Sequence, residues 1–364
     1  MLPANLNTDQ LSRAVQGFLT ITSITWDAPS GAAVRICGQL LVPSHEAYRR
    51  LEPFAAQHGC VLRLRRDGDE ACFELIPTAA APARRRGWLP ILLGVLTVLS
   101  VTASYLFFWE GYPAAGTQLA PSLAHALTFA GGLLGILLTH EFGHFLMARR
   151  LSMPVSWPYL IPFPLSPFGT LGAIIRMRGI PRNRRELVLI GVAGPLAGLV
   201  VAIPVLLTGL MLSSVETLPA SGYILEGNSL LYTLAKLLVF GRWLPSAGSD
   251  VMLHPLAFAG WAGLLVTAMN LLPSGQLDGG HIAYGLLGRT SRYLAWAVWG
   301  ILVVLGIWWR GWWLWVVLLF LTGRRYPAPL DEITTLTAPL RWLAIVMLII
   351  FVLTFTPLPM ILVN

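Results

Sequence analysis

Long apolar runs, separated by short segments rich in arginine, are the feature of this sequence that most restricts its fold. Hydrophobic residues fill 55% of the 364 positions and charged residues 12%, whereas soluble domains carry roughly 25% charged residues. Several runs approach or exceed the ~20 residues that a helix needs to cross a bilayer. We therefore expect a polytopic α-helical membrane protein with about 6–8 transmembrane helices in a lipid bilayer.

The apolar runs can be assigned to separate spans, and their order follows from the charges between them. Arginines before the first run (84–86) and after the second (149–150) predict that these ends face the cytoplasm, because cytoplasmic loops are enriched in basic residues. The same pattern explains the formal net charge of +8 without a nucleic-acid partner, which would need a basic face with interleaved aromatic residues. The expected spans are 88–108, 123–148, 187–212, 252–272, 293–309, 311–322 and 342–358, and 229–240 is too short to cross.

The first 82 residues have the mixed composition of a small soluble α+β domain. Apolar alternation predicts strands, and the spacing of Tyr48, Leu51 and Phe54 predicts a helix that stops at Gly59. The expected order is β-β-α-β-β, over residues 18–21, 34–41, 45–58, 60–65 and 71–76. Since no cluster of catalytic residue types occurs, we expect a cytoplasmic binding or regulatory domain.

All three cysteines, Cys37, Cys60 and Cys72, fall in this first domain. Their number is odd and no C-x-x-C pair occurs, so the sequence favours reduced thiols over a disulfide or a thiolate zinc site. The sequence thus predicts three parts: a soluble domain (1–82), a membrane core (83–290) and C-terminal transmembrane helices (291–364).

The segment His140-Glu141-Phe142-Gly143-His144 lies inside the second apolar run. Helical residues four apart share one face, so His140 and His144 can bind one tetrahedral zinc ion, with Glu141 beside an open coordination position. Zinc makes water acidic enough to ionise near neutral pH, and Glu141 would accept that proton as a general base. Two structural histidines are the alternative, but a buried glutamate between them would be costly in a membrane.

Catalytic zinc needs a third protein ligand, and Asp278 is the best candidate. It follows the fourth predicted span, in Asn270-Leu-Leu-Pro-Ser-Gly-Gln-Leu-Asp278-Gly-Gly, at the same cytoplasmic depth as the two histidines. Proline and glycine in this segment would break the helix and let it turn inward. Simple helix capping or turn formation could also explain an aspartate beside two glycines.

These two motifs resemble those of the site-2 protease family of intramembrane zinc metalloproteases, peptidase family M50. His140, Glu141 and His144 match H-E-x-x-H, and Asn270 to Gly279 matches N-x-x-P-x-x-x-L-D-G, 126 residues further along. The resemblance implies one Zn²⁺ per chain, held by His140, His144 and Asp278. It also implies Glu141 as the general base and Asn270 as a catalytic group that orients the substrate or steadies the oxyanion.

The architecture, a soluble domain before the first span and no long insertion at 151–185, is most similar to the chloroplast and cyanobacterial members of that family. We therefore expect a multi-pass protein of a bacterial inner or cell membrane, with its N-terminal domain and active site towards the cytoplasm. Its partners are expected to be transmembrane protein substrates, and its oligomeric state stays open.

A proline-rich segment follows the second span, and residues 168–176 after it have the pattern of a strand or hairpin. A helical substrate must be unwound before its peptide bonds can be attacked. We hypothesise that 168–176 offers a strand edge to the unwound substrate; an ordinary amphipathic loop is the alternative.

Three functions remain at this point. The leading one is an intramembrane zinc endopeptidase that cuts transmembrane segments. The second is a membrane metal-ion transporter that uses the same His and Asp residues as a transit site, which leaves Glu141 without a role. The third is a catalytically silent scaffold, against which the intact motifs argue.

Overall fold

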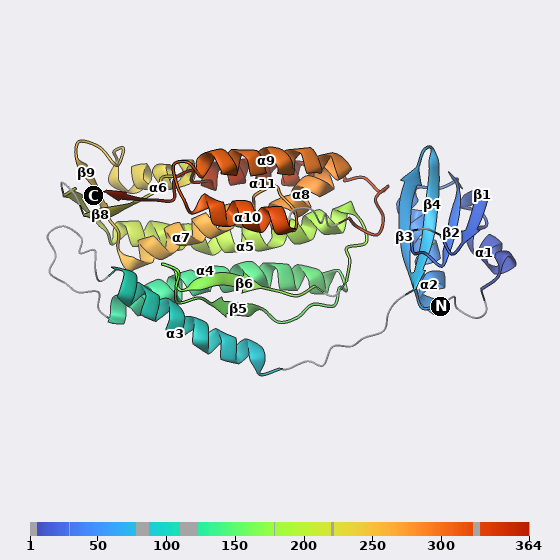
Figure 1. The fold of residues 1–364 in the computed structure, drawn as a ribbon, viewed down its shortest axis with the longest axis horizontal. Coiled ribbons are helices and arrows are strands. Elements are labelled where there is room, and N and C mark those ends of the chain that lie inside the picture. The colour runs from blue at the N-terminus through green and yellow to red at the C-terminus, as the bar shows by residue number, and fades with distance from the viewer. Residues whose placement is uncertain are drawn as a thin grey trace. The chain divides into compact units, whose positions relative to one another are not determined.

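The computed structural model describes residues 6–28, 30–77, 87–109, 123–177, 179–219, 222–322 and 328–363 (Figure 1). The chain divides into two compact units, which we describe separately. The first unit combines the N-terminal residues to 85 with the segments 180–187 and 328–338. The second unit holds the remainder. The predicted boundary at residue 82 and the arginine run 84–86 lie outside the described residues, and the division into three parts remains a prediction.

The first unit is built on a four-stranded antiparallel sheet with the order β1-β2-β4-β3. The expected β-β-α-β-β order is present, and a further helix, α1, precedes it. Asn7 caps α1 with its side chain, which accepts a hydrogen bond from the backbone of Gln10. The elements are α1 (Thr8–Val15), β1 (Leu19–Trp26), β2 (Val34–Leu40), α2 (Ser44–Gln57), β3 (Cys60–Asp67) and β4 (Glu70–Pro77).

One face of this sheet is covered by the two helices, and alternate strand residues supply the core. Leu11 of α1, Leu51 of α2 and Phe73 of β4 are fully buried together. The edge strand β3 is covered by the distant segment 328–338. There the backbone N–H of Leu64 donates to the carbonyl of Leu330 at 2.7 Å, and Glu332 N–H donates back to the Leu64 carbonyl at 3.2 Å. An edge covered in this way is protected from pairing with other chains.

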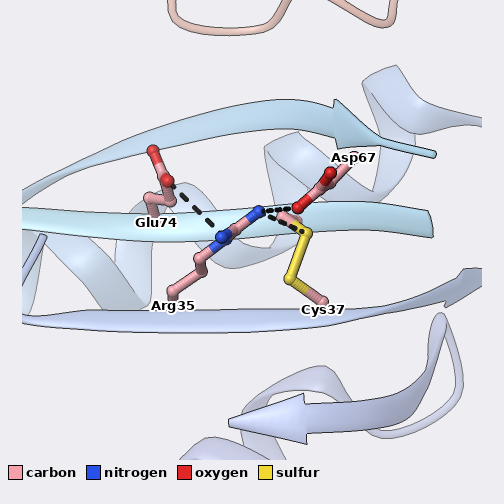
Figure 2. Close-up of a disulfide and its surroundings, with 5 residues drawn as sticks. Arg35, Cys37, Asp67 and Glu74 are labelled. Atoms are coloured by element: carbon pink, nitrogen blue, oxygen red, sulfur yellow. Dashed lines mark hydrogen bonds and ion pairs between the residues drawn. A yellow bond between two sulfur atoms is a disulfide. The ribbon is translucent and has the colours of Figure 1, made fainter. Parts of the chain in front are cut away.

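The expectation of three reduced thiols is wrong, because Cys37 and Cys72 form a disulfide. They lie directly opposite one another on β2 and β4, with their Cα atoms 4.1 Å apart. Figure 2 shows the disulfide beside Arg35, which also pairs with Asp67 at 2.5 Å. Cys60 remains free and buried.

The second unit is mostly helical, and its described strands form three short sheets of two strands each. Among the described residues, three helices are long and apolar enough to cross a membrane: Leu89–Phe108, Leu123–Arg150 and Arg184–Met211. Shorter apolar helices cover Leu230–Phe240, Pro255–Asn270, Trp312–Leu321 and Ala338–Thr354. The whole set is α3 (Leu89–Trp109), α4 (Leu123–Arg150), α5 (Arg184–Met211), α6 (Leu230–Phe240), α7 (Pro255–Asn270), α8 (Asp278–Leu287), α9 (Ser291–Leu305), α10 (Trp312–Thr322) and α11 (Ala338–Thr354).

The strands of this unit are all short. β5 (Tyr159–Pro162) and β6 (Thr170–Ile174) form an antiparallel hairpin; β6 lies within residues 168–176, which were predicted to form a strand or hairpin, whereas β5 lies before them in the proline-rich segment. The others are β7 (Ser214–Thr217), β8 (Tyr223–Glu226), β9 (Ser249–Met252) and β10 (Met360–Val363), which pair as β7 with β9 and β8 with β10. Figure 1 shows β5 and β6 running between α3 and α4.

Candidate metal centre

Helix α4 presents both histidines of the H-E-x-x-H segment to one point. His140 and His144 lie one turn apart and are buried, and their Nε2 atoms are 3.2 Å from each other. Glu141 is buried beside them, and its carboxylate accepts a hydrogen bond from the backbone N–H of Ile175, just after β6. The predicted i, i+4 geometry is therefore present.

Asp278 reaches the same point from α8, the helix that it begins. Its Oδ2 atom lies 3.1 Å from the Nε2 atom of each histidine. The first turn of α8 can approach this closely because Gly279 has no side chain: a Cβ there would lie 1.9 Å from the Leu271 carbonyl oxygen. The sequence did not predict α8, but it did predict that the chain turns inward here.

The three atoms form a triangle whose edges are 3.1, 3.1 and 3.2 Å. Ligands in a tetrahedral zinc site, at bonds of about 2.0–2.1 Å, are separated by about 3.3 Å. The cluster thus has nearly the size of one face of a zinc tetrahedron, with the fourth position left over. Among the described residues it is the group of histidine, cysteine and acidic side chains whose ligand atoms converge closely enough for a metal ion.

The protonation pattern of His144 supports a cation at this point. Its Nδ1 atom is 2.8 Å from the carbonyl oxygen of Ile190 on α5. A carbonyl can only accept, so Nδ1 carries the proton, and in the neutral ring Nε2 presents a lone pair. That lone pair faces a carboxylate oxygen and another imidazole nitrogen, an arrangement that a shared cation stabilises. A backbone carbonyl on the second nitrogen is also the usual support of a metal-bound histidine.

Helix α5 leaves room for the histidines through its Gly194-Pro-Leu-Ala-Gly198 segment. A Cβ on Gly194 would lie 2.0 Å from His144 Nε2, and a Cβ on Gly198 would lie 3.2 Å from His140 Nδ1. These two glycines therefore let α5 pack closely against the histidines of α4. Any larger residue at position 194 would occupy the space of the imidazole.

Asn270, at the end of α7, completes the polar groups at the site. Its Nδ2 atom lies 3.5 Å from His140 Nε2, so the amide is near the cluster without belonging to it. His281 is buried on α8, and its Nδ1 atom has no hydrogen-bond partner in the described part of the chain. His254 caps α7 by accepting a hydrogen bond from Leu256 N–H at 3.2 Å.

Sequence reasoning missed the two backbone groups at this site. The Ile175 N–H and the Ile190 carbonyl act through the main chain, so their side chains carry no signal. It found the four side chains His140, Glu141, His144 and Asp278, which the structure brings together. Their roles, and that of Asn270, remain predictions that this geometry supports.

Comparison with known proteins points to the same family as the two motifs. The profile of Peptidase family M50 matches residues 128–306, which include α4, α5, α7 and α8. A probable chloroplastic zinc metalloprotease of Oryza sativa subsp. indica, EGY2, is 29% identical over 350 residues, covering 89% of this chain and 61% of that protein. The EGY2 protein of Arabidopsis thaliana is 32% identical over 269 residues, covering 71% of this chain and 48% of that protein.

A third relative, the probable chloroplastic zinc metalloprotease EGY1 of Arabidopsis thaliana, is 37% identical over 178 residues, covering 48% of this chain and 32% of that protein. The chain thus spans less than two thirds of the length of these curated relatives. The resemblance inferred from the motifs is nevertheless confirmed: through residues 128–306, this chain belongs to peptidase family M50.

Proposed function

We propose that this protein is an intramembrane zinc endopeptidase that hydrolyses peptide bonds within or near the transmembrane segments of other membrane proteins. The observation that carries the proposal is the convergence of three lone-pair atoms beside a buried carboxylate, on α4 and α8, of which α4 is long and apolar enough to cross a membrane. A soluble hydrolase would have no reason to build its site into such helices.

In this proposal, one zinc ion per chain is held by His140, His144 and Asp278. The donor set of two imidazoles and one carboxylate is typical of catalytic zinc, and three protein ligands leave a position for water or substrate. When bound, zinc acts as a Lewis acid that makes water acidic near neutral pH and polarises the substrate carbonyl.

The protein's own groups would then move the protons. Glu141 takes a proton from the attacking water and passes it to the leaving nitrogen. The Ile175 N–H fixes one orientation of that carboxylate. The Asn270 amide, close to His140, donates a hydrogen bond to the carbonyl oxygen where negative charge develops.

The β5–β6 hairpin supports the idea that substrate is bound as a strand. β6 pairs with β5 on one edge, and the chain continues from β6 directly to Ile175, which contacts Glu141. A substrate strand added along β6 would bring an unwound peptide bond towards the general base. Replacing Ile174 with proline should block this pairing and reduce cleavage, and unchanged cleavage would contradict the strand-edge idea.

The finer membrane arrangement is part of the same proposal. About 6–8 helices would cross the bilayer, with the site and the N-terminal domain towards the cytoplasm in a bacterial inner or cell membrane. The arginines at the end of α4 support this orientation. The N-terminal domain would then bind or regulate on the cytoplasmic side.

The test uses the purified full-length protein with Glu141→Gln and, as a matched control, Glu226→Gln, a second buried glutamate of the same unit away from the metal cluster. Both variants should retain zinc, and only Glu141→Gln should lose cleavage of a tagged single-span membrane protein, by on the order of 10³-fold. Undiminished cleavage by Glu141→Gln would overturn the assignment. Zinc flux into vesicles containing the wild type, without cleavage, would favour a transporter instead.

A further inference from the structure

The tip of the β5–β6 hairpin lies deep along the first long apolar helix. Ser100 of α3 donates a hydrogen bond to the carbonyl of Gly169 at 2.6 Å, and Ser104 donates to the carbonyl of Pro164 at 3.0 Å. Ser100 is eleven residues from Leu89, the start of α3, or about 17 Å along the helix axis. This is roughly the middle of a hydrocarbon layer about 30 Å thick.

Backbone carbonyls at this depth need a donor from the protein. A non-helical segment is tolerated within a bilayer only where its polar groups are satisfied, and the turn between β5 and β6 is such a segment. The apolar side chain of Leu165 at the tip is 78% exposed, as expected for a group that faces lipid. The two serines therefore supply the hydrogen-bond donors that the surrounding hydrocarbon cannot supply.

These two hydroxyls differ from several threonine hydroxyls in the described helices of this unit. Serine and threonine inside helices commonly donate to the carbonyl four residues earlier. Thr97 on the same helix does so, to Leu93 at 2.7 Å, and so do Thr128, Thr139, Thr267 and Thr354. Ser100 and Ser104 instead donate to another segment, which makes them specific contacts with the hairpin.

The hairpin tip is also held by its shape and by helix α7. Gly169 has φ +69° and lies so close to α3 that a Cβ would be 2.4 Å from the Val101 Cα atom. The neighbouring Phe168 ring packs against Phe258 and Trp261 of α7, with ring centroids 6.2 and 6.3 Å apart. The tip is therefore fixed against helices on two sides.

The opposite end of the same strand is at the metal centre, where Ile175 N–H contacts Glu141. Six residues separate Gly169 from Ile175, which in extended conformation is about 20 Å. A strand fixed at both ends cannot slide relative to α4. Register is less strongly specified in strands that contain glycine, and β6 has Gly172 at its centre.

From these contacts we propose that Ser100 and Ser104 are positioning residues, which fix the depth of the β5–β6 hairpin and thereby select the substrate peptide bond that lies beside Glu141. The inference rests on the proposed addition of substrate to β6. It assigns to α3, which precedes both motifs, a part in choosing the cleavage position.

The experiment compares the purified full-length protein with Ser100→Ala/Ser104→Ala and with Thr97→Val, a control that removes a buried hydroxyl bonded only within α3. Cleavage of a tagged single-span membrane protein is followed by product mass and by kinetics. For the double variant we expect cleavage at several adjacent bonds instead of one, with KM raised about tenfold, kcat within about twofold and zinc content unchanged. Hydrogen exchange of residues 163–170 should be faster than in the wild type, and Thr97→Val should match the wild type throughout.

The proposal is overturned if the double variant keeps the wild-type cleavage site, KM and exchange at 163–170, as the control does. If the double variant loses zinc or fails to fold, the same three readouts on Ser104→Ala alone decide the matter, since one hydroxyl then remains. Failure of the underlying function has a different signature. Cleavage retained by Glu141→Gln removes the proteolytic mechanism, and cleavage unaffected by Ile174→Pro removes strand addition, whatever the serine variants do.

Discussion

Two clusters of polar side chains lie in the helical second unit, and they differ in how the charge of their carboxylates is neutralised. One is the candidate metal cluster of His140, His144 and Asp278, which has a carboxylate and two imidazoles but no lysine or arginine side chain. The other surrounds Lys236 of α6, the only lysine of the chain. Its Nζ atom lies 3.1 Å from Asp250 Oδ1 and 3.9 Å from Glu226 Oε1.

The lysine cluster contains its own cation and its own hydrogen-bond donors. Tyr232 donates to Glu226 at 2.8 Å, and the Lys236 ammonium lies 4.7 Å from the centre of the Tyr232 ring. It joins α6 to β8 and β9, so it holds structure together. Comparison of the two clusters shows that burial of charge alone does not mark a metal site. What distinguishes the candidate metal site is a set of converging lone pairs beside which the described residues place no cationic side chain.

Removal of metal should have the most different effects on the two clusters. Treatment with a zinc chelator should abolish cleavage, because the Lewis acid is lost, and added zinc should restore it. Helix α6 and its strands should stay folded, since Lys236 supplies their cation. Cleavage rates before and after chelation, with a circular dichroism spectrum of each sample, check this. Cleavage that persists with no bound metal would contradict the comparison.

The next largest effect is expected from Lys236→Met. The substitution leaves Asp250 and Glu226 buried without a cation, and breaking a buried ion pair in this way costs about 3–5 kcal/mol. Thermal unfolding in detergent should show the loss, with bound zinc unchanged in the folded fraction. Lys236→Met/Asp250→Asn should recover part of the stability, because it removes a buried charge. A variant as stable as the wild type would mean that the lysine cluster is not structural.

The smallest effect is a dependence of stability on pH. Burial raises the pKa of Glu226 to about 7, although the nearby Lys236 acts to lower it. The folded protein thus holds this proton more tightly than the unfolded chain, where the pKa is about 4.3. Its contribution to stability is complete below about pH 4 and is lost as pH rises towards 7.

Thermal unfolding should therefore become easier between pH 5 and pH 8, by an amount that Glu226→Gln reduces. An identical pH dependence in the wild type and in Glu226→Gln would show that another group is responsible.

The convergence of His140, His144 and Asp278 could be predicted from local spacing and from the order of the apolar runs, and their role as metal ligands stays a prediction. His140 and His144 follow from the helical period, and Asp278 follows from the position of the fourth apolar run. The lysine cluster was missed, because Glu226, Lys236 and Asp250 are joined by short strands that pair only in the fold. β8, for example, pairs with β10, more than 130 residues further along the chain.

Contacts between segments distant in the sequence also explain the other wrong predictions. Cys37 and Cys72 meet because β4 pairs with β2 as well as with β3. The number and spacing of the cysteines do not reveal this strand pairing. Helix α8 begins Asp-Gly-Gly, a start with low helix propensity, and is stabilised by packing against the preceding turn. The fourth span is also shorter than predicted: α7 covers Pro255–Asn270, against the expected 252–272.

The most direct measurement is the zinc content of purified Asp278→Ala beside Asp250→Ala, two substitutions that each remove an aspartate of the same unit, one partly buried and one buried. We predict that Asp278→Ala loses both zinc and cleavage, whereas the folded fraction of Asp250→Ala retains zinc at the wild-type ratio. Zinc retained by Asp278→Ala, or lost equally from both variants, would contradict the assignment of His140, His144 and Asp278 as the metal centre.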